Sequence, residues 1–340
     1  EVVGNDIVKD MFYACYKVLS ISHKVIIKGT KSFTNDLSGM QAFYTWCTKR
    51  NSKPESNLVF VMEATGVYYE NLAYFLYERD CLVSVQLAQK IKYYAKSCNL
   101  KTKTDKVDSK MIAEFGIEKN LSGTELWTPP SKSFKMIRDL SREHTSLKEA
   151  CSTAQSQLHA LQQAHSVHPR VIALKQQQIE FYKQQEEAVK QELLLLVKED
   201  KNLFDKMENI TSVKGLGFIT VIKILAETNG FLLFRNIRQL VSYAGLDVIE
   251  KESGSFKGKT KISKKGNARI RAALYMPAMT ASVYNSNLKT FYNRINEGRN
   301  EKRKGLIAVM RKLLILIYTL WRKNEAYIIN YNMNLNAVKS

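Results

Sequence analysis

The chain has 340 residues, 45% of them hydrophobic, and its 52 lysines and arginines outnumber 32 acidic residues, giving a net charge of 52 − 32 = +20. This length and apolar content exclude an intrinsically disordered chain and predict two or three domains. The charge is uneven, because residues 251–323 hold 18 basic and 3 acidic residues, or 18 − 3 = +15. Such a surplus favours a polyanionic partner, either nucleic acid or an acidic membrane surface, and we favour nucleic acid.

Cysteine usage and hydropathy argue against a disulfide-rich, a zinc-binding and a membrane-spanning protein. The five cysteines are odd in number, widely spaced and without a C-x-x-C pair, so neither a disulfide framework nor a zinc site is predicted. The longest strongly apolar run, LLILIYTLW at 313–321, is too short to span a bilayer. We therefore expect a cytoplasmic protein without a membrane partner. Because the chain starts at Glu1 without a methionine, we also expect that a few residues precede it.

Residues 1–119 predict strands and helices in the order βββαβαβα. The strands are expected at 1–9, 12–20, 23–29, 57–64 and 81–86, and the helices at 38–50, 68–80 and 105–119. Three consecutive antiparallel strands followed by alternating helix and strand suggest a mixed sheet with helices on both faces. This is the order of the ribonuclease H-like fold.

The middle of the chain has the spacing of a coiled coil. From Leu140 to His165, apolar or small residues recur at alternating steps of four and three. The pattern resumes from Ile172 to Leu196 with some polar members, and Pro169 breaks the helix between the two halves. We expect a protruding helical hairpin whose seam packs against its partner helix and against a second copy of the chain. Two core helices of a single bundle are the alternative.

A third region begins after residue 205. The segment 210–227 carries the turn Gly215 to Gly217 between two helical stretches, which suggests a helix-hairpin-helix that binds a phosphate backbone through free N–H groups. A plain corner between two helices explains the same pattern. Further on, RQLVSYAGL at 238–246 precedes a long basic loop at 247–267, predicted to lack regular structure, and apolar helices at 268–284 and 304–323. A loop of this length is more often functional or disordered than a simple connection between two elements.

Two aspartates stand three apart within the lysine-rich stretch KTKTDKVDSK at 101–110. On a helix, Asp105 and Asp108 share one face and repel each other unless a cation lies between them. A simpler interpretation is that Thr104 and Asp105 form a helix N-terminus, where acidic side chains meet free N–H groups.

In a ribonuclease H-like sheet, two further acids join this pair. Asp6 would lie on the central first strand and Glu63 at the end of the neighbouring strand, and the last helix would bring Asp105 and Asp108 across the same edge. Four carboxylates suit Mg²⁺ or Mn²⁺, and two such metals can stabilise the attacking and leaving oxygens of a phosphoryl transfer. Taken singly, Asp6 could be an ordinary strand-end aspartate and Glu63 a solvated acid before a turn.

Two sets of motifs resemble one protein family. The segments GNDIVKD (4–10), MEATGVYYENL (62–72) and KTDKVDSKMIAE (103–114) resemble the RuvC-like domain of bacterial insertion-sequence transposases of the DEDD type, relatives of Piv-type DNA invertases. Segments 215–227, 240–275 and 303–320 resemble the C-terminal transposase domain of these proteins. The family is usually apolar at the position of Asn5 and has proline at that of Val248, so the chain departs from the pattern there.

The resemblance implies a catalytic mechanism. It places the family's acidic tetrad on Asp6, Glu63, Asp105 and Asp108, and its transposase-domain serine on Ser253 of ESGS. It implies a bridge-RNA-guided recombinase, in which a noncoding RNA pairs with donor and target DNA and strands are exchanged through a serine-linked intermediate. A serine hydroxyl needs activation, and since the nearest histidine in the chain is His168, metal held by the tetrad is the better candidate. Ser255 is a minor alternative nucleophile.

The expected organisation is α/β plus α, with a RuvC-like domain at 1–130, a dimerising coiled-coil hairpin at 131–204 and a mainly helical transposase domain at 205–335. Expected partners are DNA, a guide RNA and further copies of the chain, as a dimer that assembles to a tetramer at the bacterial nucleoid. The residues expected to contact nucleic acid are glycines and basic side chains: Lys101, Lys103, Lys106, Gly215, Gly217, Lys257, Lys259, Lys261, Lys264, Lys265, Arg269 and Arg271.

Two rival functions use fewer of these residues. A metal nuclease of the Holliday-junction-resolving type would use the tetrad alone and leave Ser253 dispensable. A non-catalytic scaffold that binds RNA or DNA would need neither the serine nor the acids. The motif around Ser253 argues against both rivals.

Overall fold

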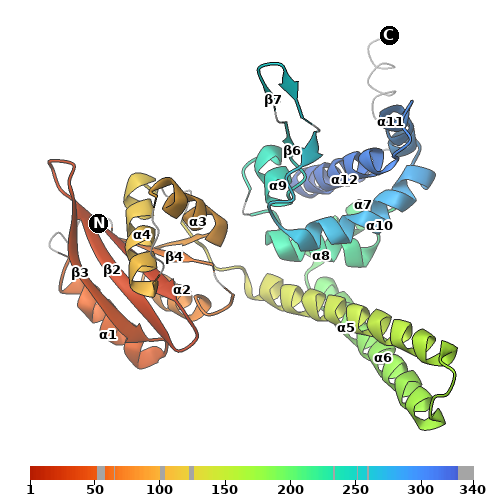
Figure 1. Cartoon of the computed structure of the whole chain (residues 1–340), viewed down its shortest axis with the longest axis horizontal. Helices are drawn as coiled ribbons and strands as arrows, with labels where there is room; N and C mark the ends of the chain where they lie inside the picture. Colours follow the sequence, from red (N-terminus) through yellow and green to blue (C-terminus); the bar gives the residue numbers. More distant parts are fainter. Residues whose placement is uncertain are drawn as a thin grey trace. The chain divides into compact units, whose positions relative to one another are not determined.

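The computed structural model describes residues 1–51, 58–64, 66–99, 104–121, 126–232, 234–250, 252–258 and 260–327, without the side chain of Lys257. The chain divides into two compact units, Glu1–Pro129 and Pro130–Ser340 (Figure 1). The expected separation of a hairpin, 131–204, from a transposase domain, 205–335, falls within the second unit and stays a prediction. Lys101, Lys103 and Lys259 lie outside the described residues.

The first unit is built on a five-stranded mixed sheet in the order β3-β2-β1-β4-β5. The strands are β1 (Val2–Ile7), β2 (Met11–Leu19), β3 (Val25–Thr34), β4 (Val59–Glu63) and β5 (Leu82–Gln86). Strands β1, β2 and β3 are antiparallel neighbours, whereas β4 runs parallel to both β1 and β5. The predicted mixed sheet is therefore confirmed, and it is compatible with a ribonuclease H-like domain.

Helices cover both faces of this sheet (Figure 1). They are α1 (Leu37–Thr48), α2 (Glu70–Tyr77), α3 (Ala88–Ser97) and α4 (Asp105–Glu118). Apolar residues alternate along β1, so that Val3 packs in one core with α1 and α2, whereas Val2 packs in another with α3 and α4. Helix α3 was not predicted, because only Ile91 and Tyr94 of its ten residues are buried, which is too few for a clear helical pattern.

Two glycines allow α4 to lie directly on the sheet. A Cβ at Gly4 of β1 would be 2.2 Å from the Ala113 nitrogen and 2.4 Å from the Ser109 oxygen of α4. A Cβ at Gly116 would be 2.7 Å from Val2. Gly116 thus faces the start of β1 and Ser109 its middle, so α4 runs antiparallel to β1. Its N-terminus therefore lies over the end of β1 that carries Asp6.

The unusual Asn5 of β1 is accommodated inside the sheet. Its side chain is fully buried, and Nδ2 donates to the Val3 oxygen at 3.2 Å and to the Val61 oxygen at 3.3 Å. These two hydrogen bonds offset part of the cost of burying an amide inside the sheet.

The second unit begins with the helical hairpin formed by α5 (Lys132–Gln163) and α6 (Pro169–Glu199), which projects from the helical body that follows it (Figure 1). The predicted break lies at Pro169, the first residue of α6, and His168 caps that helix. Cys151 and Ala154 of α5 are buried with Ile179 of α6 in a small apolar cluster between the helices.

The helical body consists of α7 (Lys201–Thr211), α8 (Phe218–Thr228), α9 (Ile237–Tyr243), α10 (Ala268–Tyr284), α11 (Ser286–Asn296) and α12 (Arg303–Lys323). Its core surrounds α12, whose Leu313 and Ile317 are fully buried. Among the described residues no helix, α12 included, is both long and apolar enough to cross a membrane. Gly215, in the turn between α7 and α8, has φ +105, and a Cβ there would be 2.9 Å from Ala281 of α10.

The predicted irregular loop is a β-hairpin arm instead. Val248–Ile249 (β6) pair with Lys261–Ile262 (β9), and Glu252–Ser253 (β7) pair with Phe256–Lys257 (β8). Each strand has two residues, which is too short for the sequence to show an alternating pattern. We call residues 247–266 the serine arm, because Ser253 lies next to the turn at its tip.

Candidate active site

Asp6 and Glu63 lie side by side at one end of the sheet. Strands β1 and β4 are parallel, with Asn5 opposite Met62, so the next residues, Asp6 and Glu63, share the carboxyl end of the strands. Side chains alternate along a strand, and the neighbours two residues back, Gly4 and Val61, both contact α4. Both acids are half-buried and belong to the face covered by α4.

The first turn of α4 brings two further acids to this end of the sheet. Thr104 caps the helix, since its side chain accepts a hydrogen bond from the Val107 N–H at 3.3 Å. Asp105 and Asp108 follow in the first turn, where the positive end of the helix dipole favours acidic side chains. The capping interpretation is therefore correct for Thr104, and Asp105 is left exposed while Asp108 is half-buried.

Strand register and the start of α4 bring the four acids to one end of the sheet, but their side chains do not form a metal-binding group in the described residues. Throughout the described parts of the chain, no three histidine, cysteine or acidic side chains are grouped so as to hold a metal ion. Asp6, Glu63 and Asp108 each take part in a polar or electrostatic interaction. The donor set of four carboxylates still fits a hard divalent cation. Metal binding by Asp6, Glu63, Asp105 and Asp108 therefore remains a prediction.

A hollow of about 260 Å³ lies beside the acids, between α4 and strands β2 and β3. Tyr13, Lys106 and Ser109 are among the residues that line it. Tyr13 is the cross-strand partner of Asp6, so the hollow continues from the acidic end of the sheet. Lys106 is exposed and lies on the same turn of helix as Asp105 and Asp108, which keeps it available to a nucleic-acid phosphate.

Ser253 is exposed near the tip of the serine arm in the second unit. It pairs with Phe256 across the two-residue turn of Gly254 and Ser255. Gly254 has φ +55, a conformation that suits glycine, and a Cβ there would meet no described atom within 4 Å. The tip is therefore exposed, with no described atom crowding Gly254.

Basic residues follow the arm toward the body. Lys261, Lys264 and Lys265 are exposed, and the side chain of Arg269 is 62% exposed. Arg271 differs, because its Nη1 donates to the Ala244 oxygen at 2.9 Å and to the Gly266 oxygen at 3.3 Å, so it joins the two ends of the arm. Nucleic-acid contacts by these residues, and by Gly215 and Gly217, stay predictions.

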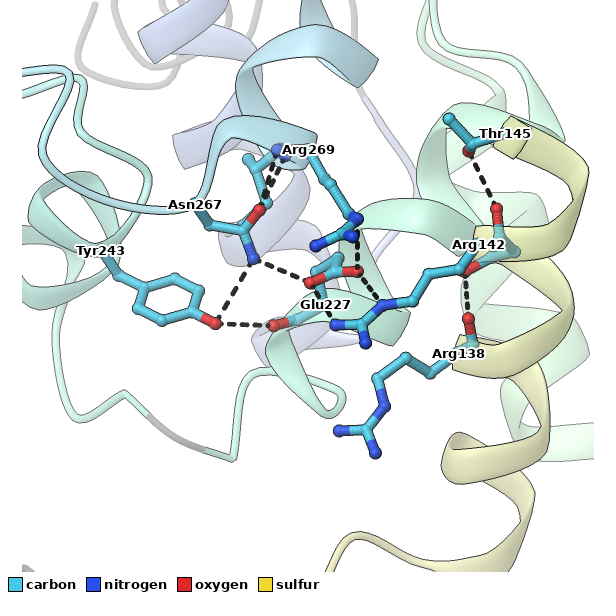
Figure 2. Close-up of polar contacts among 9 residues, drawn as sticks. Arg138, Arg142, Thr145, Glu227, Tyr243, Asn267 and Arg269 are labelled. Carbon is cyan, nitrogen blue, oxygen red and sulfur yellow. Dashed lines mark hydrogen bonds and ion pairs between the residues drawn. The ribbon is translucent and has the colours of Figure 1, made fainter. Parts of the chain in front are cut away.

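At the base of the arm, the structure shows a polar cluster that sequence reasoning missed (Figure 2). The Glu227 side chain of α8 is only 5% exposed, and it accepts hydrogen bonds from Arg142 Nε at 2.8 Å and Nη2 at 3.1 Å. Asn267 Nδ2 donates to it at 2.8 Å, and Arg269 Nε lies 3.9 Å away. Burial alone would raise the pKa of Glu227, but the hydrogen bonds from Arg142 and Asn267 hold it below the ordinary value.

The same cluster includes Tyr243 and Asn267, which flank the serine arm on either side. The Tyr243 hydroxyl, at the end of α9, donates to the Glu227 backbone oxygen at 3.3 Å. Asn267 Oδ1 caps α10 by accepting from the Arg269 and Ile270 N–H groups. The available signal in the sequence was a single acid, Glu227, within the apolar stretch of α8, although its partner Arg142 is 85 residues away.

Two family models match the chain in the regions that carry these features. Residues 3–166 match the DEDD-type IS110 model, described as "Transposase". Residues 207–293 match the model described as "Transposase IS116/IS110/IS902 family". The first match contains the four acids and the second contains the serine arm.

Curated relatives agree with these matches. The chain is 28% identical over 328 residues to the pilin gene-inverting protein of Moraxella bovis, and this alignment covers 96% of this chain and 97% of that protein. It is 25% identical over 123 residues to the transposase for insertion sequence element IS1111A of Coxiella burnetii, covering 35% of this chain and 34% of that protein. A protein of insertion element IS900 from Mycobacterium paratuberculosis is 26% identical over 121 residues, covering 35% of this chain and 30% of that protein.

Proposed function

Because the chain belongs to the IS116/IS110/IS902 family of transposases, enzymes of DNA recombination, we propose that it exchanges DNA strands through a serine-linked intermediate under the guidance of an RNA. The observation that supports this proposal most is the exposure of Ser253 at the tip of a basic arm, in the region matched by the transposase model. The four acids at one end of the sheet are the other component.

In the proposed reaction, the Ser253 hydroxyl oxygen attacks a phosphorus atom of the DNA backbone. The bond from phosphorus to one bridging deoxyribose oxygen breaks, the serine loses its proton, and the leaving oxygen gains one. The product is a phosphodiester between protein and DNA, which conserves bond energy for rejoining to a second strand. A divalent cation, when bound, would supply Lewis-acid stabilisation of the attacking and leaving oxygens.

Different residues of the chain would bind the metal and the DNA backbone. Asp6, Glu63, Asp105 and Asp108 would hold Mg²⁺ or Mn²⁺, since they share one end of the sheet. The exposed lysines of the arm and Lys106 would neutralise phosphate and orient the strand. The acids belong to the first unit and Ser253 to the second.

The charge supports a second nucleic acid as a partner. Residues 251–323 carry a net charge of +15. The basic residues of the serine arm that would position one DNA strand supply only part of this charge. A guide RNA that pairs with donor and target DNA would use the remaining charge. The chain would act as a dimer or tetramer, because exchange of strands between two DNA sites requires at least two cleavage events on each.

The experiment that tests the proposal compares Ser253→Ala with Ser255→Ala. Both serines are exposed on the same turn, so neither change should disturb the fold. We expect Ser253→Ala to bind RNA and DNA normally, yet to form no covalent protein–DNA adduct and no recombinant product, whereas Ser255→Ala should stay active. If Ser253→Ala still recombines DNA, or if the trapped adduct maps to another residue, the serine mechanism is wrong and a metal nuclease that uses the acids alone takes its place.

A further inference from the structure

The two ends of the serine arm are tied together where they leave the helical body. The Asn267 N–H donates to the Tyr243 oxygen at 2.7 Å, and Arg271 bridges Ala244 and Gly266. Gly266 has φ +154, and a Cβ there would be 2.2 Å from the Tyr243 oxygen, so only glycine fits this crossing. The direction of the arm is therefore set by whatever holds Tyr243 and Asn267.

Glu227 holds both of these residues and connects them to the hairpin (Figure 2). Its carboxylate accepts from Asn267, its backbone oxygen accepts from Tyr243, and its two oxygens form a bidentate pair with Arg142 of α5. Glu227 thus links α5 and the start of α10 through its carboxylate, and the end of α9 through its backbone oxygen.

Stability alone is a poor explanation for such a group. A buried ion pair pays a desolvation cost that often cancels its electrostatic gain, and apolar side chains of similar size frequently serve as well or better. Paired guanidinium and carboxylate groups instead impose a fixed geometry, because both hydrogen bonds must form in one plane. The cluster is therefore suited to fixing the orientation of the elements that it joins.

We propose that Glu227 is a positioning residue, which fixes the base of the serine arm to α5 of the hairpin and so presents Ser253 in one orientation. The inference rests on the proposed function, because Ser253 is assigned as the nucleophile there. Glu227 itself does not contact DNA, since its side chain is only 5% exposed. Its carboxylate acts on the reaction through Asn267, whose Nδ2 also donates to the Tyr243 hydroxyl at 3.4 Å.

The variant Glu227→Gln tests this role without leaving a buried charge behind. Glutamine keeps the size of the side chain and an oxygen that can accept from Asn267, but it loses the ion pair. Arg142, whose side chain is 40% exposed, can then be solvated by water. A matched control is Glu187→Gln on α6, which breaks the 2.9 Å ion pair between Glu187 and Lys190 at the surface of the hairpin.

The first measurement is amide hydrogen exchange at the base of the arm. Three N–H groups report on it: Ser263, which donates to Asp247; Lys264, which donates to Gly245; and Asn267. We expect Glu227→Gln to speed their exchange by about tenfold, with the amide of Ile317 in the core unchanged and Glu187→Gln without effect. Unchanged exchange at the three base amides would overturn the proposal. So would equal acceleration at Ile317, since it would indicate a general loss of stability.

The second measurement is the rate of covalent adduct formation on bound DNA. A misdirected serine should lower this rate by about 10- to 100-fold while the DNA dissociation constant stays unchanged. A normal rate in Glu227→Gln would contradict the positioning role even if exchange were faster. The two proposals fail separately, because an active Ser253→Ala variant would disprove the serine mechanism, whereas hydrogen exchange would still decide whether Glu227 fixes the arm.

Discussion

Gly4 of β1 and Ser109 of α4 are in such close contact that a Cβ at Gly4 would be 2.4 Å from the Ser109 carbonyl oxygen. Ser109 directly follows Asp108, and Gly4 precedes Asp6 by two residues on the same face of its strand. This contact therefore fixes the distance between the first turn of α4 and the acidic end of the sheet.

We predict that Gly4→Ala displaces α4 and destabilises the first unit. The added methyl group would meet backbone atoms that cannot move aside, so we expect the free energy of unfolding to fall by about 3 kcal/mol, at the upper end of overpacking costs. Strand cleavage should be lost as well. Denaturant unfolding is the measurement, and Gly217→Ala is the control for stability alone, since a Cβ there meets no described atom within 4 Å.

We predict that Asp105→Asn abolishes strand cleavage at low Mg²⁺ and leaves the fold intact. Asp105 is exposed and Thr104 still caps α4, so the stability cost should be limited to the helix-dipole term of about 0.3–1 kcal/mol. Cleavage of labelled DNA over a Mg²⁺ titration measures the effect. Asp205→Asn, at an exposed position of α7, controls for the loss of one charge, and full activity of Asp105→Asn would remove this residue from the metal site.

The sequence predicts the acidic end of the sheet well, because the information there is local. Short, largely apolar runs predict β1 and β4, and the order of the strands places Asp6 beside Glu63. The Thr104 cap predicts where α4 begins. That α4 lies directly on β1 depends on Gly4, whose role is visible only once the two elements are in contact.

The serine arm and its base were not predictable in the same way. The arm is held by two-residue strands and by hydrogen bonds near Gly266, which give no periodic signal. Glu227 finds its partners 85 residues away in Arg142 and 40 residues away in Asn267, so no local pattern connects them.

A histidine within the hairpin should make stability depend on pH. His144 of α5 is buried, its Nδ1 has no hydrogen-bond partner among the described residues, and its Nε2 lies 3.6 Å from Glu186. Burial, with help from the nearby Lys223, lowers the pKa of His144, although Glu186 opposes the shift. The neutral imidazole is therefore the form that the folded state prefers.

The sign of the pH effect follows from this preference. Below about pH 6.5 the unfolded chain binds a proton at His144 that the folded chain resists, so the free energy of unfolding should fall as the pH drops toward the folded pKa. We predict that His144→Gln flattens this decline, whereas replacement of the exposed His159 by glutamine does not. Thermal unfolding between pH 7.5 and 5.5, in buffers of equal ionic strength, checks the prediction, and identical slopes for wild type and His144→Gln would contradict it.

The binding of RNA should weaken steeply as the salt concentration rises, because the basic residues of 251–323 release counterions from the phosphates they contact. We predict that Lys261→Gln, on the exposed β9 strand, reduces the slope of log affinity against log salt by about 1. Lys183→Gln on α6 removes the same charge from the hairpin and should leave the slope unchanged. A flat salt response of the wild-type protein would argue against phosphate recognition as the main source of affinity.

The hairpin has a second apolar stripe that faces away from its partner helix. On α6, Val171, Leu174, Phe181 and Leu195 are 43%, 48%, 55% and 57% exposed. They are separated by steps of 3, 7 and 14, so they lie along one side of the helix. Ile179, Leu193 and Val197 are buried instead, which leaves the outer stripe free for another helix.

We predict that this stripe joins two copies of the chain, and that Leu174→Glu together with Phe181→Glu converts a dimer into a monomer at micromolar concentration. Both side chains are exposed in the single chain, so charges there should disturb association without unfolding the hairpin. Lys183→Glu, at another exposed position of the same helix, should leave the dimer intact. Sedimentation equilibrium with RNA present distinguishes the states. If the wild-type protein is a monomer, the hairpin packs only within its own chain. If the double variant remains dimeric, the interface lies elsewhere.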